Sequence, residues 1–138
     1  MKLIVSVSLL ASAIVIAGCG GTDSGAIPST GPSVAVIYES NPLADVQVRL
    51  HAGPTGPVIT QSISAADGTA RFSGVPSPEP DEYFVSLESL SDGGWMLDAK
   101  YSQAADSGMT LKPLVTNDGQ RIEIPSGAVR SLNINNRR

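Results

Sequence analysis

The feature that most constrains the fold of this chain is a two-residue alternation of apolar and polar side chains, which begins near Ser33. Residues 46–50, Val-Gln-Val-Arg-Leu, are the clearest example, and the pattern is typical of a strand that buries one face. No segment beyond residue 32 combines helical spacing of apolar residues with helical length. The segments predicted as strands are 33–38, 46–50, 58–64, 69–73, 83–87, 109–115, 121–124 and 132–135.

Turn-forming residues separate the predicted strands. Glycine supplies positive φ and proline fixes φ, so clusters such as 53–57 and 76–80 interrupt regular structure. Asp67-Gly68, between two β-like segments, is the strongest hairpin signal in the chain. About seven or eight short strands in roughly a hundred residues predict one all-β domain over residues 33–138. We expect an antiparallel β-sandwich, as in immunoglobulin-like domains.

The first residues of the chain have a different composition. Lys2 is followed by an apolar stretch over residues 3–17, which as a helix would span only about 22 Å, less than the roughly 30 Å of bilayer hydrocarbon. A short apolar segment behind a positive charge is typical of a cleaved signal peptide, here residues 1–18. The stretch ends in Ile16-Ala17-Gly18-Cys19, which resembles the lipobox of bacterial lipoproteins. The resemblance implies cleavage between Gly18 and Cys19 and a thioether-linked lipid on the Cys19 thiol.

Cys19 is the only cysteine, so the mature domain holds no internal disulfide and depends on a packed core for its stability. Residues 20–32 are rich in Gly, Ser, Thr and Pro and, with the lipidated Cys19, are predicted to form a flexible linker over 19–32. Gly20 occupies the position at which an Asp commonly signals inner-membrane retention in diderm bacteria. We therefore expect an outer-membrane lipoprotein that faces the periplasm or the cell surface.

The distribution of charge excludes some partners. Cleavage would remove Lys2 from the nine Lys and Arg and leave eight against 13 Asp and Glu, a net charge of −5. Because the basic residues are scattered, we expect neither a nucleic-acid partner nor electrostatic attraction to anionic lipid. Acyl chains on Cys19, such as palmitate, are then the only membrane attachment that the sequence offers, at about 0.8 kcal/mol per buried CH₂.

Three stretches carry a family resemblance. Residues 41–48, NPLADVQV, are similar to the pattern G-x-P-L-A-G-V-x-V, residues 64–76, SAADGTARFSGVP, to T-D-A-D-G-x-F-x-F-x-G-L-P, and residues 82–87, EYFVSL, to G-x-Y-x-V-x-V. These patterns belong to carboxypeptidase regulatory-like domains, which form transthyretin-like β-sandwiches. Residues 100–110 also resemble a segment of small planctomycete-type lipoproteins that carry one such domain. In metallocarboxypeptidases the domain is an accessory to the catalytic domain, so the resemblance implies a fold and no peptidase activity.

Signals for catalysis and metal binding are weak. His51 is the only histidine, it lies on the outward side of the alternation, and no serine stands in a G-x-S-x-G motif. Zinc and calcium need clustered ligands, whereas the hairpin holds Asp67 alone and residues 79–82, Glu-Pro-Asp-Glu, have the composition of a solvated turn. We expect no enzyme activity, no metal and no cofactor. An enzyme would need the fold to bring His51 beside a serine and a carboxylate.

The segment 91–107 is the candidate binding loop. Trp95 follows Asp92-Gly93-Gly94 and Tyr101 lies nearby, and exposed aromatic side chains on the loops of a β-sandwich offer flat contact surfaces to sugars or to proteins. The alternative is that Trp95 covers the end of the core. Two functions therefore stay open. One is a structural or protein-interaction module of the cell envelope, and the other is a lipid-anchored module that binds cell-wall or extracellular polysaccharide.

Overall fold

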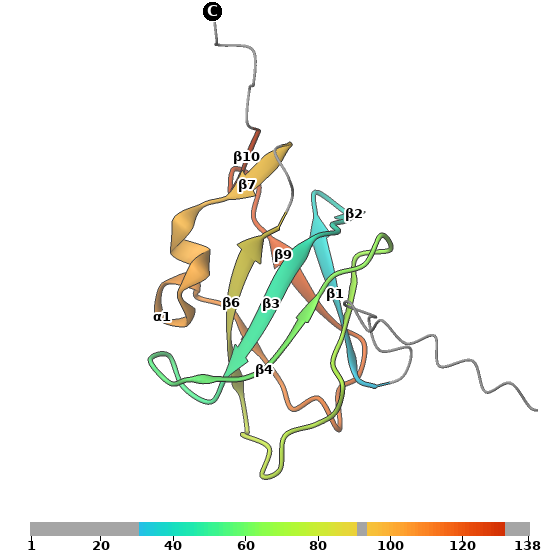
Figure 1. Ribbon diagram of the computed structural model, residues 1–138, viewed down its shortest axis with the longest axis vertical. Coiled ribbons are helices and arrows are strands. Elements are labelled where there is room, and N and C mark those ends of the chain that lie inside the picture. Colours follow the sequence, from blue (N-terminus) through green and yellow to red (C-terminus); the bar gives the residue numbers. More distant parts are fainter. Residues whose placement is uncertain (1–30, 91–93, 132–138) are drawn as a thin grey trace, which may run out of the picture.

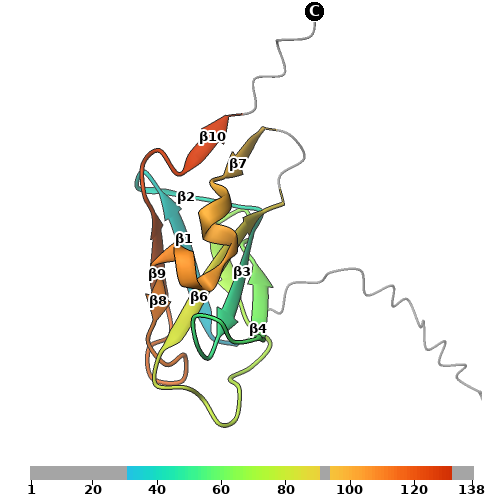
Figure 2. The same cartoon turned by 90° about the vertical axis from the view of Figure 1, so that its left-hand side faces the viewer.

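A computed structural model describes residues 31–90 and 94–131 of the chain. In this part of the chain ten short strands form two stacked sheets with a two-stranded ribbon at one end (Figure 1; Figure 2). Figure 1 looks onto the sheet that contains β3, β4 and β6, which we call the front sheet, and β1 and β9 of the back sheet lie behind it. The predicted all-β sandwich is confirmed.

The back sheet is built around β1 (Ser33–Tyr38). One edge of β1 pairs with β5 (Thr69–Arg71) and then with β2 (Asn41–Pro42), both antiparallel. The other edge pairs with β9 (Gln120–Ile124), and this pair is parallel. The parallel pair departs from the antiparallel pattern expected from hairpins, because the chain passes through the whole front sheet before it returns beside β1.

The front sheet has the strand order β4-β3-β6-β8. Its strands are β3 (Val46–His51), β4 (Val58–Ile63), β6 (Tyr83–Ser89) and β8 (Thr110–Leu111), and all neighbouring pairs are antiparallel. The register places Gln61 of β4 and Ser86 of β6 on either side of Arg49 of β3, so these three side chains share one face of the sheet.

Two short helical segments and a ribbon complete the fold. The ribbon pairs β7 (Trp95–Leu97) with β10 (Val129–Ser131), and the chain continues from β7 into η1 (Ala99–Ser102) and α1 (Ala104–Ser107). At the end of α1, Ser107 donates a hydrogen bond to the carbonyl oxygen of Val85 in β6, and the Val85 N–H donates to the carbonyl of Met109. These contacts cover the edge of β6 beyond β8. Among the described residues no helix is long and apolar enough to cross a bilayer.

Alternate residues of the main strands fill the space between the sheets. In β3, Val46, Val48 and Leu50 are fully buried, while the residues between them are partly exposed, as the alternation predicts. The largest fully buried side chains are Tyr83, Phe72, Leu50, Leu87 and Leu114. Burial of this apolar surface is the main stabilising contribution in a domain whose described part contains no cysteine.

The predicted hairpin at Asp67-Gly68 forms and passes from the front sheet to the back sheet. Gly68 N–H donates to the carbonyl of Ala65, Ala65 N–H donates to the carbonyl of Thr69, and the Asp67 carboxylate accepts from the Thr69 N–H. Gly68 has a φ of 76°, and a Cβ at this position would lie 2.6 Å from Cβ of Pro42 and 2.9 Å from the Val36 carbonyl oxygen. Glycine is therefore required here by both conformation and space.

Several strand boundaries differ from the sequence-based prediction. β1 has the predicted bounds, whereas the strand expected over 109–115 is only Thr110–Leu111. The strand expected over 132–135 lies outside the described residues, and β10 precedes it at Val129–Ser131. β2, β7 and the helical segments were not predicted. Each has two to four residues, which is too short for a periodic pattern to show.

Candidate binding face

The outward side of the front sheet, which we call the front face, gathers polar side chains from neighbouring strands. Its members alternate with the core residues of the same strands. The front face consists of Gln47, Arg49 and His51 of β3, Val58, Gln61 and Ile63 of β4, and Phe84, Ser86 and Glu88 of β6.

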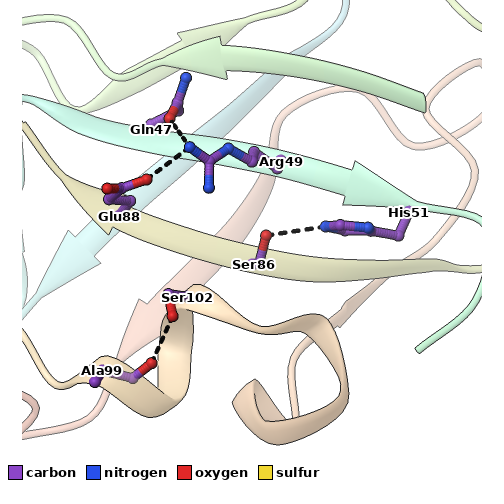
Figure 3. A network of polar contacts seen from close by, with 7 residues as sticks. All are labelled: Gln47, Arg49, His51, Ser86, Glu88, Ala99 and Ser102. Carbon is purple, nitrogen blue, oxygen red and sulfur yellow. Dashed lines mark hydrogen bonds and ion pairs between the residues drawn. The ribbon is translucent and has the colours of Figure 1, made fainter. Parts of the chain in front are cut away.

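Arg49 lies at the centre of the front face. Its Nη2 donates hydrogen bonds to Oε1 of Gln47, at 2.5 Å, and to Oε2 of Glu88, at 2.6 Å (Figure 3). The Arg49 side chain is 28% exposed and that of Glu88 is 47% exposed, so both remain accessible to a partner. Hydrogen bonds with an ionised donor or acceptor are strong, and the two that Arg49 donates, one to an amide and one to a carboxylate, fix the direction of the guanidinium before any partner arrives.

His51, at the end of β3, is held by hydrogen bonds at both ring nitrogens. Nδ1 lies 2.9 Å from the carbonyl oxygen of Gly56, and Nε2 lies 2.9 Å from Oγ of Ser86 (Figure 3). A carbonyl oxygen only accepts, so Nδ1 carries the proton, and in the neutral ring Nε2 then accepts from the Ser86 hydroxyl. His51 lies on the outward side, as predicted, but it is half-buried and connects β3, the loop before β4, and β6.

The contact of His51 with Ser86 has the donor and acceptor arrangement of a serine–histidine pair. However, the third partner is the backbone carbonyl of Gly56 and not a carboxylate. Ser86 is only 1% exposed, so a substrate does not reach its hydroxyl oxygen in this arrangement. The geometry thus supports a structural contact that satisfies a buried hydroxyl.

Aliphatic side chains of β4 flank the polar centre of the front face. Val58 is 43% exposed and Ile63 is 39% exposed, and the register places them beside His51 and Gln47 respectively. β4 is the edge strand of the front sheet, and no other described strand runs along the edge from Val58 to Gln61. The front face therefore combines a fixed ion pair with exposed apolar surface, a composition found in protein interfaces.

The aromatic residues of the candidate binding loop have different positions. Tyr101 is 3% exposed and belongs to the core cluster, so its ring does not offer an open face to a ligand, which corrects the expectation for this residue. Trp95, in β7, is half-buried and packs against the core. Met96 beside it is 46% exposed. Residues 91–93 of this loop lie outside the described residues.

The acidic turn at residues 79–82 was expected to be solvated, but the Glu79 side chain makes hydrogen bonds within the protein. Oε1 of Glu79 accepts hydrogen bonds from the Tyr83 hydroxyl, at 2.8 Å, and from the Leu114 N–H, at 2.5 Å. Burial, with the hydrogen bond to Glu79, raises the pKa of Tyr83 above its ordinary value, so the phenol stays protonated. We call these three residues the Glu79 network, and it fastens the loop after β8 to the start of β6.

Three aspartates similarly fasten turns by accepting backbone N–H groups. Asp118 accepts from the Ser33 N–H at 2.6 Å, Asp67 from that of Thr69, and Asp98 from that of Lys100. In each case the backbone hydrogen bond is the largest cause that lowers the pKa of the carboxyl group. Among the described residues, no group of three or more His, Cys, Asp or Glu is arranged to hold a metal.

A hollow of about 520 Å³ lies on the opposite side of the molecule, over β1 and β9. Its walls include Ile37, Glu39, Arg121 and Glu123. The side chains of Glu39, Arg121 and Glu123 make no hydrogen bond or ion pair with another described residue. The front face, in contrast, holds Arg49 and His51 in place by hydrogen bonds, so we take it as the candidate site.

Comparisons with known protein families, curated proteins and solved structures gave no significant match. Gly18 and Cys19, the predicted cleavage and lipidation residues, lie outside the described residues. The structure therefore adds the front face to the candidate sites without bearing on the predicted anchor.

Proposed function

We propose that the protein is a lipoprotein of the bacterial cell envelope whose non-catalytic β-sandwich binds another protein through the front face. The observation that carries this proposal is the arrangement of Arg49, fixed by Gln47 and Glu88, beside the exposed side chains of Val58 and Ile63. An arginine that is already oriented loses little conformational freedom on binding, and apolar contacts around it exclude water.

The exposed apolar residues favour a protein partner over a polysaccharide. In the part of the chain that the structure describes, the exposed large hydrophobic side chains are all aliphatic or methionine, namely Val58, Ile59, Ile63, Val75, Leu90, Met96 and Val115. Aromatic rings are the side chains that stack on flat ligand faces, and here Tyr101 is buried, while Trp95, Tyr38 and the front-face residue Phe84 are half-buried. Polysaccharide binding remains the alternative function to be tested.

The membrane attachment in this proposal is the acyl group on Cys19. Residues 1–18 would be removed as a signal peptide, and the linker up to Pro32 would separate the β-sandwich over 33–138 from the membrane. Gly20 supports an outer-membrane location. The resemblance to carboxypeptidase regulatory-like domains agrees with a non-catalytic β-sandwich, because in metallocarboxypeptidases that domain is an accessory beside the catalytic domain.

Photo-crosslinking in intact cells tests the proposed function. A photoreactive amino acid replaces Gln61 in the front face of the full-length chain, and the same residue replaces Glu123 on the back sheet as the control. Both positions are exposed strand residues with outward side chains. We expect a discrete protein adduct from position 61 and none from position 123. Equal adducts from the two positions, or adducts with polysaccharide only, would contradict the proposal.

The anchor is tested separately by mass. We expect the mature protein to begin at Cys19 and to carry the added mass of its acyl chains, whereas the Cys19→Ala chain should lack both the cleavage and the lipid. An unlipidated mature chain, or one with a different first residue, would refute the assignment. Binding of the Cys19→Ala chain to purified cell-wall polysaccharide would favour the alternative function.

A further inference from the structure

The predicted linker enters the β-sandwich at a fixed place, at one end of the molecule. The Phe72 N–H donates to the carbonyl of Pro32, and a Cβ on Gly31 would lie 2.1 Å from the Phe72 carbonyl oxygen. The Ser33 N–H donates to the Asp118 carboxylate at 2.6 Å. The linker thus meets the domain between the loop after β5 and the loop before β9, at the end opposite the β7–β10 ribbon (Figure 1).

Two loops at this end carry exposed aliphatic side chains. Val75, in the loop between β5 and β6, is 36% exposed, and Val115, in the loop between β8 and β9, is 68% exposed. The Glu79 network joins the two loops, because Glu79 of the first accepts the Leu114 N–H of the second. Both valines are therefore held beside the entry of the linker. We call this part of the molecule the anchor end, and it consists of residues 31–33, 72–82 and 112–119.

We infer that the anchor end rests on the membrane that holds the lipid of Cys19, with Val75 and Val115 inserted between the lipid head groups. This inference rests on the lipid anchor of the proposed function, and it adds the direction in which the β-sandwich faces the membrane. The roughly twelve residues from Cys19 to Gly31 reach about 20 Å as a random coil. The ribbon lies farther away by the length of β6, whose seven residues span about 23 Å. Contact of the anchor end needs no stretching of the linker, whereas contact of the ribbon end requires a linker extended beyond its average reach.

The two broad faces of the β-sandwich are less suited to lipid than the anchor end. The front face holds Arg49 and Glu88 at its centre. The outward side of the back sheet holds Arg121 and Glu123 beside the hollow. Contact of either face with lipid would remove these charged groups from water, which is unfavourable.

Apolar contact must hold the anchor end on the lipid. Glu79 and Asp118 already accept hydrogen bonds from backbone N–H groups. The remaining charged residues of this end are Lys112, Asp81 and Glu82, so its charge gives no attraction to anionic lipid. Two valine side chains bury little surface and bind lipid weakly by themselves. The covalent lipid keeps them at the membrane, and the raised effective concentration compensates for this weakness.

This orientation gives the front face a defined direction. β3 and β6 run between the anchor end and the ribbon end (Figure 1; Figure 2), so they would rise from the membrane. The front face then points sideways, where it is open to another protein in or on the same membrane.

A fluorophore at the anchor end tests the inference. Cys19 is the only natural cysteine and its thiol would carry the lipid, so one added thiol can be labelled alone. The full-length lipidated protein is placed in vesicles of phosphatidylethanolamine and phosphatidylcholine that also contain a lipid with a quencher on its acyl chain. A fluorophore on Thr116→Cys, next to Val115, should be quenched. The control is the same fluorophore on Met96→Cys, in the ribbon, where the native side chain is 46% exposed, and it should not be quenched.

Replacement of the valines shows whether they hold the anchor end on the lipid. In the chain labelled at position 116, Val75→Ser together with Val115→Ser should reduce the quenching at least about threefold, because less apolar surface enters the lipid. Ile63→Ser is the matched control, since Ile63 is 39% exposed on β4, outside the anchor end, and should leave the quenching unchanged. Thermal unfolding of each variant shows whether it is folded.

The possible outcomes separate this inference from the proposed function. Absence of quenching at position 116, equal quenching at position 96, or undiminished quenching in the valine variant would overturn the inference. The lipid mass on Cys19 and the protein adduct from position 61 are independent measurements. If both are found without quenching, the proposed function stands and the orientation is wrong. If Cys19 carries no lipid, the anchor and the orientation both fail. If position 61 captures no protein while position 116 is quenched, protein binding by the front face fails and the orientation stands.

Discussion

The Glu79 network and the front face are both organised by a glutamate, but their glutamates have different surroundings. Glu79 accepts hydrogen bonds from Tyr83, which is fully buried, and from the backbone of Leu114. Glu88 accepts from Arg49 in a pair that is open to solvent on both sides. Loss of the Glu79 carboxylate leaves the buried Tyr83 hydroxyl without an acceptor, whereas water can take the place of the Glu88 carboxylate beside Arg49. The Glu79 network therefore serves stability, and the Arg49–Glu88 pair is available for recognition.

The largest loss of stability is expected at Gly68, which belongs with the Glu79 network among the positions that hold the fold. Gly68→Ala places a Cβ against Pro42 and Val36 in a left-handed conformation, and should lower the free energy of unfolding by roughly 3 kcal/mol or more. Urea denaturation measures this change. Gly74→Ala is the matched control, because no atom lies within 4 Å of its added Cβ, and it should change stability little. Similar losses in both variants would show that the hairpin contact is unimportant.

A smaller loss is expected when the Glu79 network is broken. Glu79→Ala removes the acceptor of two hydrogen bonds and leaves the Tyr83 hydroxyl buried, so the free energy of unfolding should fall by about 2–3 kcal/mol. Asp81→Ala, two residues away on the same loop, provides the control. Its side chain is exposed and makes no hydrogen bond with another described residue, and its effect should stay within about 0.5 kcal/mol. A near-zero effect of Glu79→Ala would remove the distinction between the two glutamates.

The comparison also explains what could be predicted from the sequence. Alternation placed β1 and β3 correctly, because burial of one face of a strand requires it, and it placed Arg49 and His51 on the outward side. It did not place Glu88 beside Arg49 or Ser86 beside His51, because these contacts depend on the register between β3 and β6. Likewise the role of Glu79 depends on Leu114, which is distant in sequence. Tyr101 looked like a loop residue because η1 is too short to show a helical period.

Acid should weaken the fold through the aspartates that hold its turns. The pKa of Asp118 is lowered, mainly by the Ser33 N–H, from an ordinary value of 3.8. Its stabilising contribution is therefore complete above about pH 4 and is lost as the pH falls through the lower value in the folded protein. Asp118→Asn should reduce the decline of stability below pH 4, as measured by urea denaturation across the acid range. Asp81→Asn should leave the decline unchanged, and the same decline in Asp118→Asn would contradict the role of this turn.

The smallest effect on stability, with a large effect on binding, is expected for Arg49. Arg49→Ala removes an exposed ion pair, so the free energy of unfolding should fall by less than about 1 kcal/mol. The same change removes the oriented positive charge of the front face, and crosslinking from position 61 in cells should fall steeply. Arg121→Ala, on the outward side of β9, removes an exposed arginine from the opposite sheet and should leave crosslinking unchanged. A large loss of stability with undiminished crosslinking in Arg49→Ala would reverse the comparison, because Arg49 would then act as Glu79 does.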